Sequence, residues 1–134
     1  MNSRQNFPLS VLIIEHDNDL ANSIRLYLED TFLVYAMAGT SLLVEYISKY
    51  NINFIIIDLD TPDPDLKEKL KSVKVEKPEV KTIVIYMFMD EDGQNEFSIL
   101  KEADDCICKP FDADILKYKL NKLISQATVK NTSS

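Results

Sequence analysis

The sequence predicts an α/β protein built on a five-stranded parallel sheet, and two observations lead to this fold class. Short apolar runs alternate along the chain with stretches whose apolar residues recur at helical spacing, five of each. The strongest run, Phe54–Ile57, is apolar at every position, as expected of a strand that is covered on both faces. Because parallel neighbours need crossover connections, strict alternation favours a doubly wound sheet with right-handed crossovers and helices on both faces.

Three strands and two helices are expected in the first half of the chain. The strands are short and rich in β-branched or aromatic residues, and they cover residues 11–14, 33–37 and 54–57. Asp17 to Asp19 offer side-chain caps for the first helix, and Thr40 or Ser41 can cap the second. The inward residues at helical spacing are Leu20, Ile24, Tyr27 and Leu28 in the first helix and Leu43, Tyr46, Ile47 and Tyr50 in the second.

Two strands and three helices are expected in the second half. The strands cover residues 82–87 and 106–108. A third helix begins near Asp65 after a loop marked by two prolines, a short fourth helix covers residues 95–102, and Asp112 can cap the last helix. The inward residues of these helices are Leu66, Leu70 and Val73, then Phe97 and Leu100, then Leu116, Leu120 and Leu123.

The 134 residues suit a single domain. We expect an N-terminal tail at residues 1–8, one folded domain at residues 9–125, and a polar tail or the start of a linker at residues 126–134. The net charge of −7 argues against direct binding to nucleic acid, whose phosphates this surface would repel. The sequence shows neither a membrane-spanning apolar run nor a secretory signal, so the expected location is the cytoplasm and no membrane contact is expected.

The two cysteines, Cys106 and Cys108, lie two residues apart on an expected strand. Their side chains then share a face but are too far apart for an easy disulfide, and two ligands are too few for a structural zinc site. We expect reduced and mostly buried thiols.

Charged residues follow three of the expected strands. The strands end in Glu15-His16-Asp17, Asp58-Leu59-Asp60 and Lys109-Pro110. In an open parallel sheet, ligands bind beyond the carboxyl ends of the strands, so these side chains should converge on one edge. Crowded carboxylates repel one another unless a cation or a proton lies between them, and a divalent cation with oxygen ligands is the natural guest. A lysine beside it can receive an anion such as a phosphoryl group.

These motifs resemble those of the receiver domain of two-component response regulators, over about residues 9–124. The matching segments are Glu15 and His16 at the family's acidic pair, Asp58 with Pro62 at the phosphoacceptor, and Ala103-Asp104-Asp105 followed by Lys109-Pro110-Phe111 at the last strand. The resemblance implies a flavodoxin-like sheet with strand order 2-1-3-4-5. It also implies a cis bond between Lys109 and Pro110, which the proline makes tolerable.

The resemblance further implies a function in signal transduction. Asp58 would accept a phosphoryl group from a histidine kinase or a phosphotransfer protein, and Lys109 would contact that group. Glu15, Asp58 and the backbone carbonyl of Asp60 would hold Mg²⁺ or Mn²⁺. No enzymatic activity is expected beyond self-catalysed phosphotransfer and dephosphorylation. A homodimer through the face of the fourth helix, fifth strand and fifth helix is a possible assembly.

Three positions depart from the family pattern. His16 replaces the second acid, which should weaken magnesium binding or shift preference toward manganese or zinc; alternatively, His16 points to solvent while Asp17 or Asp60 lends a carboxylate. Met87 replaces the switching Ser or Thr, and a thioether cannot donate a hydrogen bond to a phosphoryl oxygen. Cys106 replaces the switch aromatic residue.

These departures leave an alternative open, a pseudo-receiver that acts as a protein-interaction module without a phosphoryl cycle. A flavin carrier of similar architecture is a third hypothesis, which the segment after the first strand disfavours. It needs a phosphate-binding loop after the first strand, where this chain has the acidic segment Glu15 to Asp19.

Overall fold

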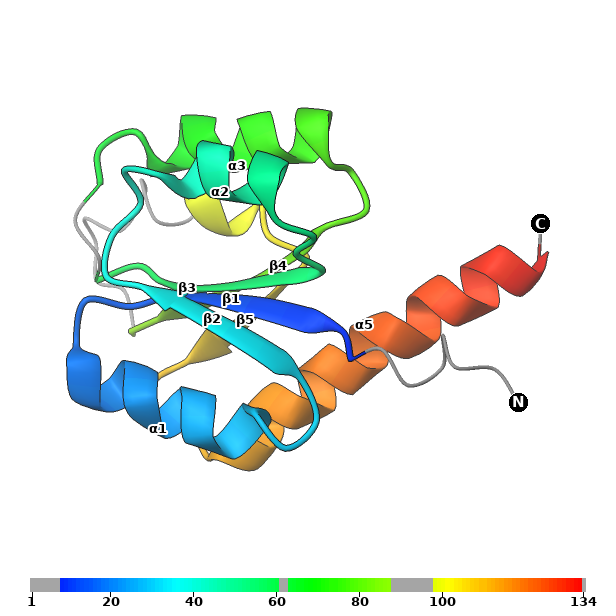
Figure 1. The fold of residues 1–134 in the computed structure, drawn as a ribbon, viewed down its shortest axis with the longest axis horizontal. Coiled ribbons are helices and arrows are strands. Elements are labelled where there is room, and N and C mark those ends of the chain that lie inside the picture. Colours follow the sequence, from blue (N-terminus) through cyan, green and yellow to red (C-terminus); the bar gives the residue numbers. More distant parts are fainter. Residues whose placement is uncertain (1–7, 61–62, 88–97, 134) are drawn as a thin grey trace.

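The computed structural model describes residues 8–60, 63–87 and 98–133, with side chains described as far as residue 126. Five parallel strands form one sheet in the order β2-β1-β3-β4-β5, which confirms the predicted fold class and strand order (Figure 1). The strands are β1 Ser10–Ile14, β2 Leu33–Met37, β3 Phe54–Asp58, β4 Lys81–Tyr86 and β5 Asp105–Cys108. The labelled helices are α1 Asn18–Leu28, α2 Leu43–Lys49, α3 Leu66–Glu76 and α5 Ala113–Ser133.

The helices form two layers, with α1 and α5 on one face of the sheet and α2 and α3 on the other (Figure 1). Successive side chains of a strand point to opposite faces, and β1 follows this rule: Val11 and Ile13 pack with α1 and α5, whereas Leu12 and Ile14 pack with α2 and α3. Each face therefore has its own core, and for this reason β1, β3 and β4 contain the unbroken apolar runs 11–14, 54–57 and 83–85.

The first helix begins as predicted and the second does not. The carboxylate of Asp17 accepts hydrogen bonds from the backbone N–H groups of Asp19 and Leu20 and caps α1. The prediction that Thr40 or Ser41 caps α2 is wrong: the N-cap residue is Leu42, which forms no side-chain cap.

The inward faces of the helices are largely as expected. Leu43 and Ile47 of α2 are buried, but Tyr50 follows the last residue of α2 and is 39% exposed, contrary to the prediction. The expected inward residues of α3 and α5 are all buried, namely Leu66, Leu70, Val73, Leu116, Leu120 and Leu123.

The segments on either side of β5 differ from the prediction in the end of β4 and in the length of α5. β4 ends at Tyr86, one residue before Met87. Residues 98–100 are helical, and the first part of the expected fourth helix, with Phe97, lies outside the described residues. α5 continues to Ser133 through the expected polar tail, and its last turns project beyond the sheet (Figure 1).

Both cysteines are free thiols, as predicted, but they are not mostly buried. Cys106 is half-buried and Cys108 is exposed, because β5 is an edge strand of the sheet. Within the described part of the chain, no helix is both long enough and apolar enough to span a membrane.

Candidate functional site

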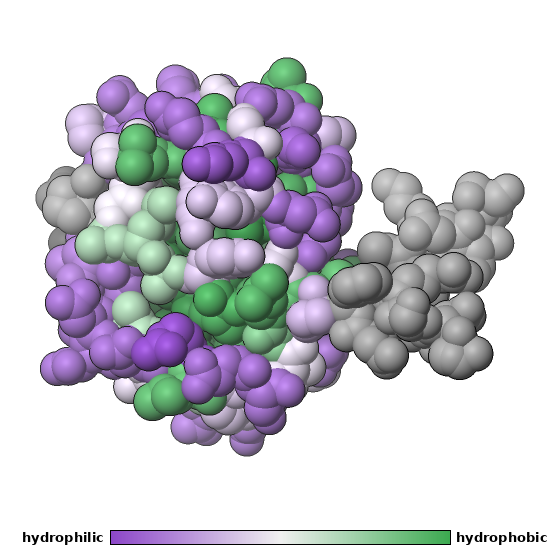
Figure 2. Space-filling model, viewed as in Figure 1, coloured by the Kyte–Doolittle hydropathy of each residue, from purple (hydrophilic) through white to green (hydrophobic). Residues whose placement is uncertain are grey.

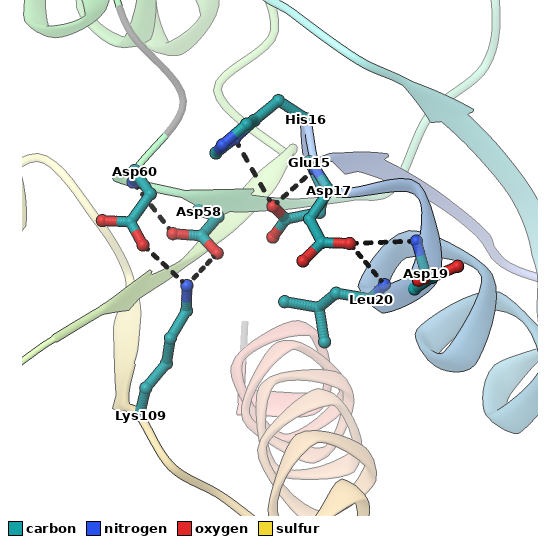
Figure 3. Close-up of polar contacts among 8 residues, drawn as sticks. All are labelled: Glu15, His16, Asp17, Asp19, Leu20, Asp58, Asp60 and Lys109. Atoms are coloured by element: carbon teal, nitrogen blue, oxygen red, sulfur yellow. Dashed lines mark hydrogen bonds and ion pairs between the residues drawn. The ribbon is translucent and has the colours of Figure 1, made fainter.

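The carboxyl ends of β1, β3 and β5 bring Glu15, Asp58 and Lys109 together, as the sequence predicted (Figure 3). The ammonium group of Lys109 forms an ion pair with Asp58 Oδ2 and lies 3.0 Å from Asp60 Oδ2. Glu15 and Asp58 are almost completely buried, with exposed fractions of 3% and 1%. The result is a pair of buried carboxylates with one ammonium beside them.

The register of the sheet explains this convergence. Ile14 lies beside Ile57 in the parallel pairing of β1 and β3, so Glu15 follows directly beside Asp58. Lys109 is placed by the backbone of β4, because its N–H donates to the Tyr86 carbonyl at 2.7 Å. The predicted cis peptide bond between Lys109 and Pro110 is present.

Backbone hydrogen bonds orient both buried carboxylates. The N–H of Asp17 donates to Glu15 Oε2 at 3.1 Å, and the N–H of Asp60 donates to Asp58 Oδ1 at 2.9 Å. Each bond closes a tight turn two residues after the acid. The loops that follow β1 and β3 therefore hold the acids at the strand ends.

The protonation states of the two acids differ. Burial, reinforced by hydrogen bonding to Asp58, raises the pKa of Glu15 from 4.5 to about 7. Burial also opposes ionisation of Asp58, but the hydrogen bonds from Glu15 and Lys109 outweigh it and lower the pKa of Asp58. Burial works against the charge of Lys109 as well, but its two aspartate partners prevail and raise its pKa. Asp58 is therefore ionised near neutral pH, whereas Glu15 is close to half-protonated.

Two buried oxygens of this pocket are suited to a proton or a cation. When both acids are ionised, Glu15 Oε1 and Asp58 Oδ2 have no hydrogen-bond donor among the described residues, apart from the ion pair of Asp58 with Lys109. Two ionised carboxylates cannot satisfy each other, because both only accept hydrogen bonds. A shared proton or a hard cation resolves this conflict, so the donor set fits a magnesium-like ion.

His16 and the acids next to the pocket do not complete a set of side-chain ligands for a metal ion. No group of three His, Cys, Asp or Glu side chains among the described residues is arranged to hold a metal. The side chain of His16 is 50% exposed, and its Nδ1 lies 3.6 Å from Glu15 Oε2 (Figure 3). Asp17 is engaged at the start of α1, and the Asp60 carboxylate pairs with Lys109. A cation would thus depend on Glu15, Asp58, backbone oxygens and water.

Met87 and Cys106, the two positions at which the family pattern has its switch residues, depart from that pattern in chemistry. Met87 follows the last residue of β4 and is 55% exposed. Cys106 is half-buried on β5, beside Val84 of β4. Neither side chain supplies the hydroxyl or the large ring that the family pattern has at these positions.

Two features near the site had no signal in the sequence. The Asp63 carboxylate accepts hydrogen bonds from Thr40 Oγ1 and from Lys69 Nζ, the latter at 2.9 Å, and its own side chain is only 6% exposed. This network ties the loop after β3 to the loop before α2. An apolar groove of about 460 Å³ lies beside Lys109 between α1 and the start of α5.

The family of the chain follows from a comparison with known protein families. Residues 11–121 match the family model of the response regulator receiver domain. The chain belongs to this family. It is therefore a receiver domain of the kind found in response regulators of two-component signalling. Receiver domains of this family generally bind Mg²⁺ for phosphorylation and interact with histidine kinases or phosphotransfer proteins.

Individual relatives agree with this assignment. The chain is 30% identical over 121 residues to the cell cycle response regulator CtrA of Brucella ovis, a match that covers 89% of this chain and 51% of CtrA. It thus spans about half the length of the curated relatives that it matches.

Solved receiver structures share the fold. A CheY-like response regulator receiver domain protein from Methanospirillum hungatei superposes with a TM-score of 0.76 at 24% identity, covering 90% of this chain and 98% of that one. A response regulator from Thermotoga maritima superposes with a TM-score of 0.73 at 22% identity, covering 89% and 99% of the two chains.

Proposed function

We propose that this receiver domain accepts a phosphoryl group on Asp58 from the phosphohistidine of a histidine kinase or phosphotransfer protein. The observation that carries the proposal is the buried, ionised carboxylate of Asp58 at the end of β3, paired with the ammonium of Lys109. A lone buried carboxylate would be neutral and non-nucleophilic, so this ion pair keeps Asp58 reactive near neutral pH. The proposed location is the cytoplasm, where such kinases present their phosphohistidines.

In the transfer, an Asp58 oxygen attacks phosphorus and the phosphorus–nitrogen bond to the donor histidine breaks. The bonding electrons return to the imidazole, which takes up a proton. Lys109 moves from the free carboxylate to the acyl phosphate and pairs with one of its oxygens. Beyond this self-catalysed transfer and its hydrolysis, we propose no enzymatic activity.

A divalent cation fits this mechanism at the unpartnered carboxylate oxygens. Glu15, Asp58 and the backbone carbonyl of Asp60 would hold Mg²⁺ or Mn²⁺. The ion supplies positive charge that offsets the repulsion between Asp58 and the incoming phosphoryl oxygens. His16, half-exposed and next to Glu15, favours a weaker magnesium site or a shift toward manganese or zinc.

Intact-mass analysis after incubation with acetyl phosphate and Mg²⁺, Mn²⁺ or Zn²⁺ tests the proposal. We expect one phosphoryl adduct on the wild type and none on Asp58→Asn. Asp65→Asn, which changes an exposed aspartate of the same loop, serves as the matched control and should retain the adduct. Equal labelling of Asp58→Asn and the wild type would remove Asp58 from the role.

The second candidate function is a pseudo-receiver that binds partners without a phosphoryl cycle. The side chains of Met87 and Cys106 favour it, because neither can respond to a phosphoryl group as a hydroxyl and an aromatic ring do. This function predicts no adduct with beryllium trifluoride and no change of backbone chemical shifts on adding metal. In either case, the face of residues 98–100, β5 and α5 is the proposed partner or homodimer surface.

A further inference from the structure

Among the described residues, no strand pairs with the outer side of the edge strand β2. β2 is the last strand of the sheet on its side. The N–H of Leu33 donates to the Leu9 carbonyl, and the Met37 carbonyl accepts from Glu15 N–H, so the odd-numbered residues turn their backbone groups toward β1. Backbone groups alternate sides along a strand. Val34 and Ala36 therefore direct their N–H and C=O groups away from the sheet.

This edge lacks the features that normally keep edge strands apart. Charged residues make up 28% of the chain, yet none occurs from Thr31 to Val44, which is the longest uncharged stretch of the sequence. The stretch contains no proline either. Natural proteins usually protect an exposed edge with charged side chains, proline or a bulge, because an unprotected edge recruits another strand.

Exposed apolar and aromatic side chains accompany the open backbone. Leu33 is 48% exposed and Ala36 is exposed. Tyr35 of β2 packs against Tyr46 and Tyr50 with ring centroids 5.8 Å away in each case, and those two rings lie 4.4 Å apart. The view over β2 in Figure 2 shows apolar and weakly polar surface at the centre of this face and hydrophilic residues around it.

We propose that the β2 edge is a self-association surface, on which a second copy of this chain pairs its own β2 in antiparallel orientation. A two-fold axis at Tyr35 gives two equivalent pairs: Val34 of each copy lies opposite Ala36 of the other copy. These are the residues with outward backbone groups, so both pairs can exchange their N–H···O=C bonds. The two Tyr35 residues then face each other in the closer, non-hydrogen-bonded pair, where aromatic neighbours stabilise a sheet. The strand is thus complementary to itself.

The two-fold symmetry of this pairing favours a second copy as the occupant, and the lack of charge from residue 31 to residue 44 permits its approach. Two copies with a net charge of −7 each repel over most of their surfaces. The uncharged β2 edge is the region where they approach with the least repulsion. The surface lies at the opposite end of the sheet from β5, so it leaves the partner face of β5 and α5 free in both copies.

Sedimentation equilibrium of the wild type and of two edge variants tests the proposal. We expect concentration-dependent dimers of the wild type. Ala36→Pro removes an outward N–H without touching the β1 side of the ladder, and Leu33→Lys adds charge to the edge; both should be monomeric at concentrations where the wild type is dimeric. Ala36→Ser, which keeps the N–H, and Leu26→Lys, which charges a 63% exposed leucine of α1, should remain dimeric.

Hydrogen exchange on the wild type gives a result that does not depend on the folding of any variant. Raising the protein concentration should slow exchange at Val34 and Ala36 and leave the exposed helix residues unchanged. A wild type that is monomeric throughout, or a dimer whose Val34 and Ala36 amides exchange at the dilute rate, overturns the proposal. Dimers that survive both Leu33→Lys and a folded Ala36→Pro also overturn it.

Discussion

The acidic pocket and the two switch positions follow the family pattern to different degrees. In the pocket, Glu15 and Asp58 are buried side by side, and the half-buried Lys109 forms an ion pair with Asp58. At the switch positions, Met87 is exposed and Cys106 is half-buried, and both lack the expected functional group. Capture of a phosphoryl group requires charged groups at fixed positions, and the pairing of the strands fixes those positions. Transmission of the signal from the phosphoryl group requires a hydroxyl and an aromatic ring, and strand pairing alone does not provide these side chains. Under the proposed function, the pocket is a capture region, and Met87 and Cys106 belong to a transmission region.

Asp58→Asn is expected to have the largest effect on the capture region. The amide keeps the shape of the side chain but is not nucleophilic, so covalent labelling by acetyl phosphate should be lost completely. Phosphate-affinity electrophoresis or intact mass measures the loss. Retained labelling would mean that another residue accepts the group.

Lys109→Ala should reduce the rate of labelling by on the order of 100-fold, because it removes the ammonium that stabilises the developing phosphoryl charge. It also leaves the buried Asp58 without its cation, so the pKa of Asp58 should rise. Lys119→Ala is the matched control, since Lys119 is a similarly buried lysine that pairs with Asp105 at 2.8 Å. A Lys109→Ala rate equal to that of Lys119→Ala would show that the ion pair is not needed for capture.

Glu15→Gln should change how stability depends on pH. The folded state raises the pKa of Glu15 from 4.5 to about 7, so it binds more protons than the unfolded state between these values. The free energy of unfolding should therefore fall as pH rises through this window. Glutamine mimics the protonated acid, and at pH 8 we expect the variant to exceed the wild type by on the order of 1–3 kcal/mol.

Urea unfolding in the presence of a chelator, at pH 5 and pH 8, measures this difference. Glu45→Gln, at an exposed position of α2, is the control and should follow the wild type. A Glu15→Gln variant whose stability keeps the pH slope of the wild type would contradict the assignment of the proton to Glu15.

Met87→Thr combined with Cys106→Tyr should have the smallest effect on capture and a distinct effect on transmission. Labelling of Asp58 should stay near the wild-type rate, because neither residue contributes charge to the pocket. Beryllium trifluoride should, however, shift the backbone resonances of β5 and α5 more in the double variant than in the wild type. Equal shifts in both proteins would indicate that the native side chains already transmit the signal.

Local patterns in the sequence determined the fold class, the position of the acidic pocket and the start of the first helix. The alternation of apolar runs with amphipathic stretches predicted the parallel sheet, and the acids after residues 14 and 57 predicted the pocket, because neighbouring parallel strands end together. The cap of α1 by Asp17 was also predictable, because the backbone N–H groups that it accepts from belong to residues only two and three positions further along the chain.

Tertiary packing decided the features that depend on residues far apart in the chain. Thr40 has the chemistry of a helix cap, but the fold places it beside Asp63, and the hydroxyl donates to that buried carboxylate instead. Cys108 is apolar enough for a core, but its position on an edge strand exposes it. Which buried acid holds the proton was also undetermined by the sequence, because both are carboxylates. The placement of Lys109 against Asp58 decided it, since the charge of one ammonium stabilises the ionised form of the acid that it contacts.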